Sequence, residues 1–396
     1  MRTPARVLPL LICLGLIPSP AHGAVIEVFN TGLDEFGNVL GEDAEDPHYE
    51  IFAGPVTLPR AVAATSAGGF PIPPWVAETP TSTWVTPSAS TNGPPGDYTY
   101  RTTFNVAGLR PETVVVTGRW ATDNIGTDVL VNGVPSNNPN PAQFPVFTPF
   151  AAGGARAGSN TLDFVLNNAP PGENPTGVHV TDLSATGFAE GTRSITLHNT
   201  GVSGPNNPNG TNSTVLTSGG TDTHYFVTTP GGFDALPASV VLNQPAYFNG
   251  AGNSLFVNNT GNGQINEPVG VYTYRTVFDL TGLDPSTASI LGRVLVDNDV
   301  TDVLINGTST GITASGFDAN SFRDFAIESG FVEGTNTLDF LVNNAGETPN
   351  PTAFRVDLLR GAAMPIPEPS AAVFAVAGLA LLALRRYKAI PATQAA

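Results

Sequence analysis

Apolar and polar residues alternate along many short stretches of this chain, a pattern typical of half-buried β-strands. In the stretch 98–104 the aromatic residues fall on one face and the polar residues on the other. The inward face is expected to carry Tyr98, Tyr100 and Phe104. Clusters of Gly, Pro and Asn separate such stretches and mark turns. The pattern predicts an all-β protein whose strands each turn one face to a core.

The same stretch returns 174 residues later, as Tyr272-Thr273-Tyr274-Arg275. Two more landmarks return at this spacing, because Asp123-Asn124 is matched at 297–298 and Asn132-Gly133 at 306–307. A fixed spacing held over three landmarks indicates two copies of one structural unit. We therefore expect two tandem domains, copy one at 24–190 and copy two at 191–363.

Each copy contains about eight alternating stretches, which favours an antiparallel sandwich of two sheets. The two Asn-Gly pairs predict tight two-residue turns, because both positions tolerate positive φ. The strand that ends at Trp120 and the strand that begins at Asp128 are expected to pair as a hairpin around the Asp-Asn loop.

The first 23 residues have the pattern of a secretory signal peptide. Arg2 and Arg6 precede an apolar run at 7–17, and small residues then allow cleavage before Ala24. We expect export by the Sec pathway, with a buried N-terminal helix as the alternative. The only cysteine, Cys13, lies in this leader, so the mature protein is expected to have no disulfide.

The segment 364–396 has an equally ordered pattern. Pro367-Glu368-Pro369 is followed by an apolar run at 370–384 and then by Arg385 and Arg386. Fifteen residues span about 22 Å as a helix, less than a hydrocarbon core of about 30 Å. The basic residues after the run are expected to keep that end in the cytoplasm.

This order of Pro-Glu-Pro, short hydrophobic helix and arginine cluster resembles the PEP-CTERM sorting signal of Gram-negative bacteria. The resemblance implies that an exosortase reads the motif after transient anchoring in the inner membrane. It also implies removal of the tail, with the protein ending at the cell surface or in the extracellular matrix. A permanent single-span anchor is the alternative.

The charge narrows the choice of partners. The formal net charge is −17, and between the two terminal segments 32 acids stand against eleven arginines. Binding to nucleic acid or anionic lipid needs clustered basic residues, so neither is expected as a partner. Divalent cations and neutral polymers are compatible with so acidic a chain.

The second half of each copy resembles the galactose-binding-like jelly roll, most closely the sugar-binding domain of family 2 glycosidases. In copy one the matching residues are Val131-Asn132-Gly133 with Gly158 and Asn160. In copy two they are Ile305-Asn306-Gly307 with Gly334 and Asn336. The resemblance implies a jelly-roll sandwich and carbohydrate binding. It does not extend to the long loops at the front of each copy.

All three tryptophans lie in copy one. An exposed indole offers an apolar face that stacks on a sugar ring. Trp75 follows two prolines in a loop, and we assign it and Trp84 as candidate carbohydrate-binding residues. Core packing is the competing interpretation, and it is favoured for Trp120 because this residue continues a strand.

Oxygen-bearing residues gather around the Asp-Asn pairs. Calcium takes six to eight oxygen ligands, and jelly rolls of the kind resembled often hold a structural Ca²⁺. The candidate ligands are Asp123, Asn124 and Asp128 in copy one, with Asp297, Asn298 and Asp302 in copy two. An Asx-turn, in which these side chains hold the loop by local hydrogen bonds, is the alternative.

Two histidines also repeat, since Asp46-Pro47-His48 is matched by Asp222-Thr223-His224. An acid–base pair for catalysis and a copper or zinc ligand are two interpretations. The third is that each aspartate fixes the start of a strand through hydrogen bonds to the backbone. No nucleophile recurs beside the histidines, so we expect no enzyme activity.

These patterns together predict an exported, non-catalytic protein that associates with extracellular polysaccharide through its sandwich domains. A purely structural surface protein without a ligand and a hydrolase acting on glycans are the alternatives. The ligand, the oligomeric state and the cleavage position in the C-terminal segment do not follow from the sequence.

Overall fold

The computed structural model describes residues 23–70, 73–232, 234–250 and 253–366. The first 22 residues of the predicted leader lie outside the described residues, as do the Pro-Glu-Pro motif, the helix expected at 370–384 and the basic residues after it. Regular structure in the described part is β-strand, apart from three short 3₁₀ turns at Ser66–Gly68, Pro111–Thr113 and Pro285–Thr287. The all-β prediction is confirmed. No helix in the described ranges is long and apolar enough to cross a membrane.

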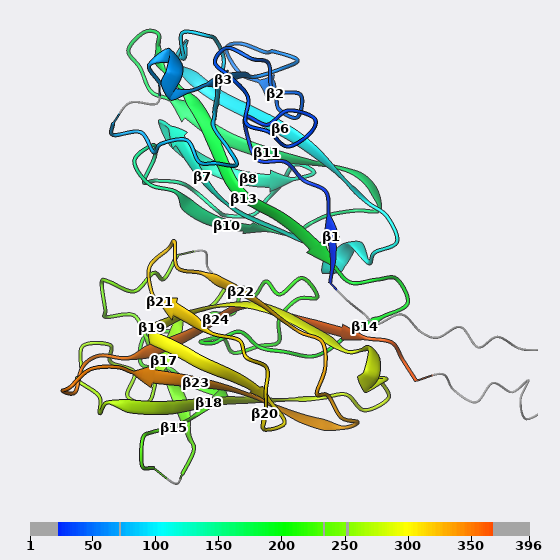
Figure 1. The fold of residues 1–396 in the computed structure, drawn as a ribbon, viewed down its shortest axis with the longest axis vertical. Coiled ribbons are helices and arrows are strands. Elements are labelled where there is room, and N and C mark those ends of the chain that lie inside the picture. Colours follow the sequence, from blue (N-terminus) through cyan, green and yellow to red (C-terminus); the bar gives the residue numbers. More distant parts are fainter. Residues whose placement is uncertain (1–22, 71–72, 233, 251–252, 367–396) are drawn as a thin grey trace, which may run out of the picture.

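Copy one contains two antiparallel sheets (Figure 1). The first sheet runs in the order β10 (Thr148–Ala152), β7 (Val115–Asp123), β13 (Gly177–Gly187), β4 (Trp84–Thr86) and β3 (Val62–Ala64), and β1 (Ala24–Ile26) also pairs with β13. The second sheet runs β2 (Glu50–Ala53), β6 (Gly96–Val106), β11 (Gly158–Asn168), β8 (Ile125–Val131) and β9 (Val134–Pro135). A short separate pair joins β5 (Asn92–Gly93) and β12 (Asn174–Pro175).

Copy two has equivalent strands, but here they form one continuous eleven-stranded sheet, and one long strand replaces β7 and β8. The first half of β19 (Ser289–Ile305) pairs with β22 (Arg323–Ile327) and β24 (Ala353–Ala363). Its second half pairs with β23 (Thr335–Asn344) and β20 (Thr308–Ser309). The remaining strands are β14 (Arg193–Ser194), β15 (Thr221–Thr228), β16 (Leu236–Val241), β17 (Phe256–Asn258), β18 (Gly270–Asp279) and β21 (Ala314–Gly316).

The expected hairpin between the strands on either side of Asp123-Asn124 is wrong. β7 and β8 lie in different sheets, and the chain crosses from one sheet to the other at this pair. The backbone N–H of Asn124 donates to the carbonyl of Asn167, and its side-chain oxygen accepts from Ala169 N–H. The polar pair therefore fastens the chain to the opposite sheet instead of folding it back. In copy two β19 changes its pairing partner at the equivalent place, from β24 up to Asp297 to β23 from Asp299 onward.

The inward faces expected from the alternation are confirmed. Tyr98 and Tyr100 are completely buried and Phe104 is 4 % exposed, while Trp120 is completely buried in the same core. The matching residues of copy two are buried in an equivalent core, namely Tyr272, Tyr274, Phe278, Leu338, Phe340 and Val342. Removing such side chains from water is the main favourable contribution to folding.

The two Asn-Gly turns also form as expected. Asn132 has φ 53° and Gly133 has φ 75°, and the corresponding values at Asn306 and Gly307 are 50° and 77°. Two successive positive φ angles match the right-handed twist of the strands that they join. The turns connect β8 to β9 and β19 to β20.

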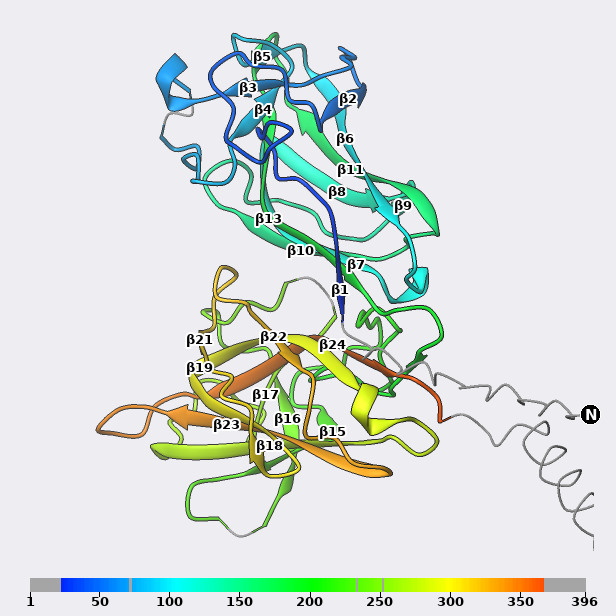
Figure 2. The same cartoon turned by 45° about the vertical axis from the view of Figure 1, so that its right-hand side comes forward.

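Equivalent faces of the two copies lie against each other (Figures 1 and 2). Val115 and Ala151 of copy one form an apolar cluster with Leu358 of copy two. Nη2 of Arg360 donates to the hydroxyl of Thr186 across this boundary. The copies are therefore in direct contact through both apolar and polar side chains.

Candidate ligand-binding groove

The repeated Asp-x-His element organises the backbone. One carboxylate oxygen of Asp46 accepts the N–H groups of His48 at 2.8 Å and Tyr49 at 3.2 Å. The other accepts Gly32 N–H at 2.7 Å. Burial raises the pKa of Asp46 to about 6, against the lowering effect of these hydrogen bonds. The His48 ring stacks on Phe29 with centroids 3.6 Å apart.

Copy two repeats this arrangement. Asp222 accepts the N–H groups of His224 at 2.9 Å and Gly201 at 2.7 Å, and His224 stacks on the ring of His198. Each aspartate thus connects a turn to the start of a strand. This matches the third interpretation of the motif, in which the carboxylate fixes the backbone.

The predicted calcium ligands do not converge in copy one. Asn124 Oδ1 accepts Ala169 N–H at 2.7 Å, and Asp123 Oδ1 accepts the Asn124 amide at 2.5 Å. Asp128 Oδ1 accepts the N–H groups of Val129 and Asn138, each at 2.8 Å. These oxygens accept protein N–H groups, but the donors at 138 and 169 are distant in sequence, so the bonds are not the local ones of an Asx-turn.

The same holds in copy two. Asn298 Oδ1 accepts Ala345 N–H, Asp302 Oδ1 accepts Val303 N–H, and Asp297 Oδ2 accepts the Tyr247 hydroxyl at 2.7 Å. Within the part of the chain that the structure describes, no three His, Cys, Asp or Glu side chains are grouped so as to hold a metal. All six predicted ligands accept hydrogen bonds from protein groups in this structure, and their assignment to calcium stays a prediction.

The two tryptophans proposed to stack on sugar lie in the interior. Trp84 is completely buried and Trp75 is 8 % exposed, with ring centroids 4.2 Å apart. Trp84 Nε1 donates to the carbonyl of Val76, and the N–H of Val76 donates to the carbonyl of Phe144. Trp75 packs against the rings of Phe70, Trp84 and Phe144, so neither indole has an open face for stacking on a sugar.

Trp75 instead holds a buried carboxyl group. It donates a hydrogen bond to Asp123, and burial raises the pKa of Asp123 to about 7. In copy two the Tyr247 hydroxyl makes the equivalent bond to Asp297, whose pKa burial also raises. The different aromatic residues at this position therefore perform one structural task.

A serine–histidine pair that the sequence did not reveal lies inside copy one. Ser82 Oγ and His179 Nε2 are 2.8 Å apart, and both residues are completely buried. Burial lowers the pKa of His179 to about 3. The distance suits a nucleophile and its base, but a substrate has no access to either group in this conformation.

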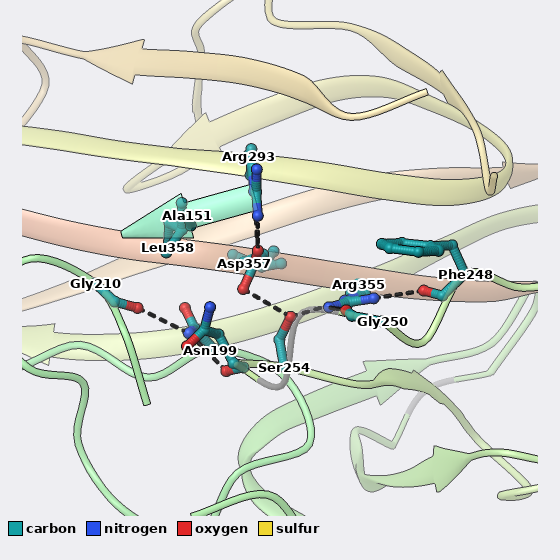
Figure 3. A network of polar contacts seen from close by, with 12 residues as sticks. Ala151, Asn199, Gly210, Phe248, Gly250, Ser254, Arg293, Arg355, Asp357 and Leu358 are labelled. Atoms are coloured by element: carbon teal, nitrogen blue, oxygen red, sulfur yellow. Dashed lines mark hydrogen bonds and ion pairs between the residues drawn. The ribbon is translucent and has the colours of Figure 1, made fainter. Parts of the chain in front are cut away.

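Copy two has a charged network at the equivalent place (Figure 3). The buried Arg355 donates through Nε to Ser254 Oγ at 2.7 Å and through Nη2 to the carbonyl of Gly250 at 2.9 Å. Ser254 donates to Asp357, which also accepts Nη2 of Arg293 at 2.6 Å. Burial would raise the pKa of Asp357, but Arg293 and Arg355 hold it below its ordinary value.

Beside this network an open groove of about 720 Å³ runs along β19 and β21. Its polar lining consists of Asp299, Thr301, Thr313, Ser315, Asn320, Ser321 and Arg323, and Phe322 adds an aromatic ring. β19 supplies the first two of these residues and pairs with β21, so that Asp299 lies opposite Ser315. The groove therefore rests on paired strands rather than on a free loop.

The segment 317–322, called the wall below, borders this groove through Asn320, Ser321 and Phe322. The Asp318 carboxylate accepts Asn320 N–H at 2.7 Å, and the carbonyl of Asp318 accepts Ser321 N–H at 3.1 Å. The Phe322 ring lies 4.0 Å from the guanidinium carbon of Arg293. The buried network beneath the groove thus supports the wall through a cation–π contact.

One carboxylate and one guanidinium line the groove, so its formal charges balance. Hydroxyl and amide groups supply further donors and acceptors. Such a lining suits a neutral polyhydroxylated ligand better than an ion. Of these residues, the sequence had pointed only to Asp299, as an oxygen ligand beside the repeated Asp-Asn pair. The available signal was the difference between copies, since copy one has Ile125 where copy two has Asp299.

No family model and no curated protein matches this sequence. Among solved structures, the chain is similar to the tandem CBM51 modules of the family 98 glycoside hydrolase from Streptococcus pneumoniae SP3-BS71. The two share 9% identity with a TM-score of 0.21, and the match covers 86% of this chain and 100% of that chain.

Proposed function

We propose that this protein is an exported, non-catalytic surface or matrix protein that binds neutral extracellular polysaccharide through the groove of copy two. The observation that carries the proposal is the composition of that groove. Asp299 offers acceptors, Arg323 offers donors, and Phe322 offers an aromatic ring in one lining. Sugar hydroxyls both donate and accept hydrogen bonds, and the C–H face of a sugar ring packs on an aromatic ring.

The location belongs to the same proposal. The leader at 1–23 supports Sec-dependent export, and the Pro-Glu-Pro segment supports processing by an exosortase after transient anchoring. We further propose that each copy is a galactose-binding-like jelly roll, on the evidence of the shared Val/Ile-Asn-Gly and Gly-x-Asn elements. The acidic composition favours a neutral polymer over an anionic one.

Affinity electrophoresis of the purified protein in gels containing neutral polysaccharides tests the function. Wild type is expected to be retarded by at least one gel, and Asp299→Ala and Arg323→Ala to lower the affinity about tenfold each. Arg156→Ala, an exposed residue outside the groove, is the matched control and should migrate like wild type.

Three results would count against the proposal. Absence of retardation by every polysaccharide, supported by an empty glycan array, would favour a purely structural role. Release of new reducing ends from the polysaccharides would reveal a hydrolase. Equal retardation of wild type and both groove variants would place binding elsewhere on the protein.

A further inference from the structure

We propose that Arg119 of copy one is a positioning residue for the groove of copy two, so that the two copies form a single binding unit. The wall at 317–322 is the link, because it contacts copy one on its other side. The effect of Arg119 on ligand affinity rests on the proposed function. The effect of Arg119 on the mobility of the wall does not depend on the proposed function.

Two residues of the wall face two cavities. Asn320 and Phe322 line the groove, and they also line a smaller cavity of about 130 Å³ between the copies. Copy one supplies Arg119 and Asp182 to that smaller cavity, and copy two supplies Arg293. A displacement of the wall would therefore change the shape of the groove and of the cavity together.

Arg119 holds this wall from the side of copy one. Its Nη1 donates to the side-chain oxygen of Asn320 at 3.2 Å. Its Nε donates to Asp182 at 2.7 Å, and this aspartate belongs to β13 of the same copy. The guanidinium is planar, so a single orientation serves both partners. Copy one thereby fixes the arginine, and the arginine restrains Asn320.

Arg293 holds the same wall from the side of copy two. It occupies the position equivalent to Arg119, 174 residues later in the sequence. Asp357 fixes its guanidinium through bonds of 2.6 and 2.8 Å, and the Phe322 ring packs against it. Two equivalent arginines from two copies thus contact neighbouring residues of one short segment.

Hydrogen exchange of the full-length protein tests the restraint without any ligand. Arg119→Ala is expected to speed exchange of backbone amides in 317–322 about tenfold, because a local opening becomes easier. Arg119→Lys should behave similarly, since one ammonium group cannot reproduce the planar contact with both Asp182 and Asn320. Arg156→Ala should exchange like wild type. Unchanged exchange in both Arg119 variants, or full rescue by lysine, would overturn the inference.

Affinity electrophoresis on the polysaccharide that retards wild type tests the consequence for binding. Arg119→Ala should weaken retardation about fivefold, and it should have no further effect in an Asn320→Ala background. An equal further loss in that background would mean that Arg119 acts independently of Asn320, which contradicts a positioning role. If no polysaccharide retards wild type, the proposed function fails, while the exchange rates still decide whether Arg119 restrains the wall.

Discussion

His179 and Arg355 occupy equivalent places in the last strands of the two copies, and each is completely buried beside a serine hydroxyl. The environments differ in charge. His179 lies between Trp84 and Phe147, with centroid distances of 5.5 and 4.9 Å, whereas Arg355 joins the network of Asp357 and Arg293. One backbone plan therefore accommodates a neutral ring in one copy and a permanent cation in the other.

The first prediction concerns the pH dependence of His179. Its folded pKa is about 3, below the ordinary 6.5, so in this range the unfolded chain binds a proton that the folded chain does not. Its contribution to stability is complete above pH 6.5 and is lost as the pH falls toward 3, by about 1.4 kcal/mol per unit. His179→Gln should be less stable than wild type near pH 7.5, and this difference should shrink below pH 6.5.

Urea unfolding at several pH values measures this difference. Val180→Ala, a buried apolar change in the same strand, is the control and should keep a constant difference from wild type. A constant difference for His179→Gln as well would show that His179 does not titrate with a depressed pKa.

The second prediction compares the repeated ion pairs on the outer face of the sheets. Arg101 Nε lies 2.6 Å from Asp163, and Arg275 Nε lies at the same distance from Asp339. The Arg101 side chain is 19% exposed and that of Arg275 is 50% exposed. Arg101→Ala should lower the free energy of unfolding by about 3 kcal/mol, because it leaves Asp163 buried and unpaired.

Arg275→Ala leaves Asp339 as buried as Asp163, but water screens the more exposed Arg275 more strongly, so this variant should cost less, about 2 kcal/mol. The measurement is urea unfolding of both variants in one buffer, repeated at high salt. High salt should reduce the stability difference between wild type and Arg275→Ala. It should reduce the difference between wild type and Arg101→Ala less. Equal losses in the two variants would show that exposure does not decide the strength of these pairs.

The alternation of apolar and polar residues predicted which side chains of each strand face the core. It did not predict which strands pair with each other. Tyr98 and Tyr100 had to face inward in any sandwich. The strand after Asn124, by contrast, could belong to either of the two sheets with the same alternation. Similarly, the composition of the loop around Trp75 suggested exposure, because proline-rich loops usually lie at the surface. Its burial depends on the loop around Phe144, and single-sequence patterns contain no information about that contact.

The groove escaped prediction for a related reason. It combines Asp299 on β19 with Arg323, and a variable loop separates these residues in the sequence. Neither residue belongs to a repeated motif. The repeated motifs consist of residues that both copies require in order to fold. Under the proposed function, the positions at which the copies differ indicate binding better than the positions that they share.

The third prediction concerns metal. The oxygens of Asn124, Asp128 and Asn298 already accept backbone N–H groups. Calcium would have to share these oxygens with the donors, and the predicted ligands of copy one do not converge on one point, so we expect the melting temperature to be unchanged by excess EDTA or by millimolar Ca²⁺. Differential scanning calorimetry of the purified protein measures this. A rise in melting temperature with Ca²⁺ that EDTA reverses would restore the calcium assignment.

The last prediction explains why the Val/Ile-Asn-Gly turn and the Gly-x-Asn strand recur together. The Asn132 amide donates to Asn160 Oδ1 at 2.8 Å, and the Asn160 amide donates to the carbonyls of Arg156 and Gly158. Asn306 and Asn336 repeat the first of these bonds at 2.8 Å. Because Asn160 is buried, Asn160→Ala should cost about 3 kcal/mol, and Asn160→Asp should also destabilise since it replaces two donated bonds with repulsion. Urea unfolding measures both, with the exposed Asn105→Ala as control. A loss below about 0.5 kcal/mol would mean that the paired asparagines do not hold the turn to the strand.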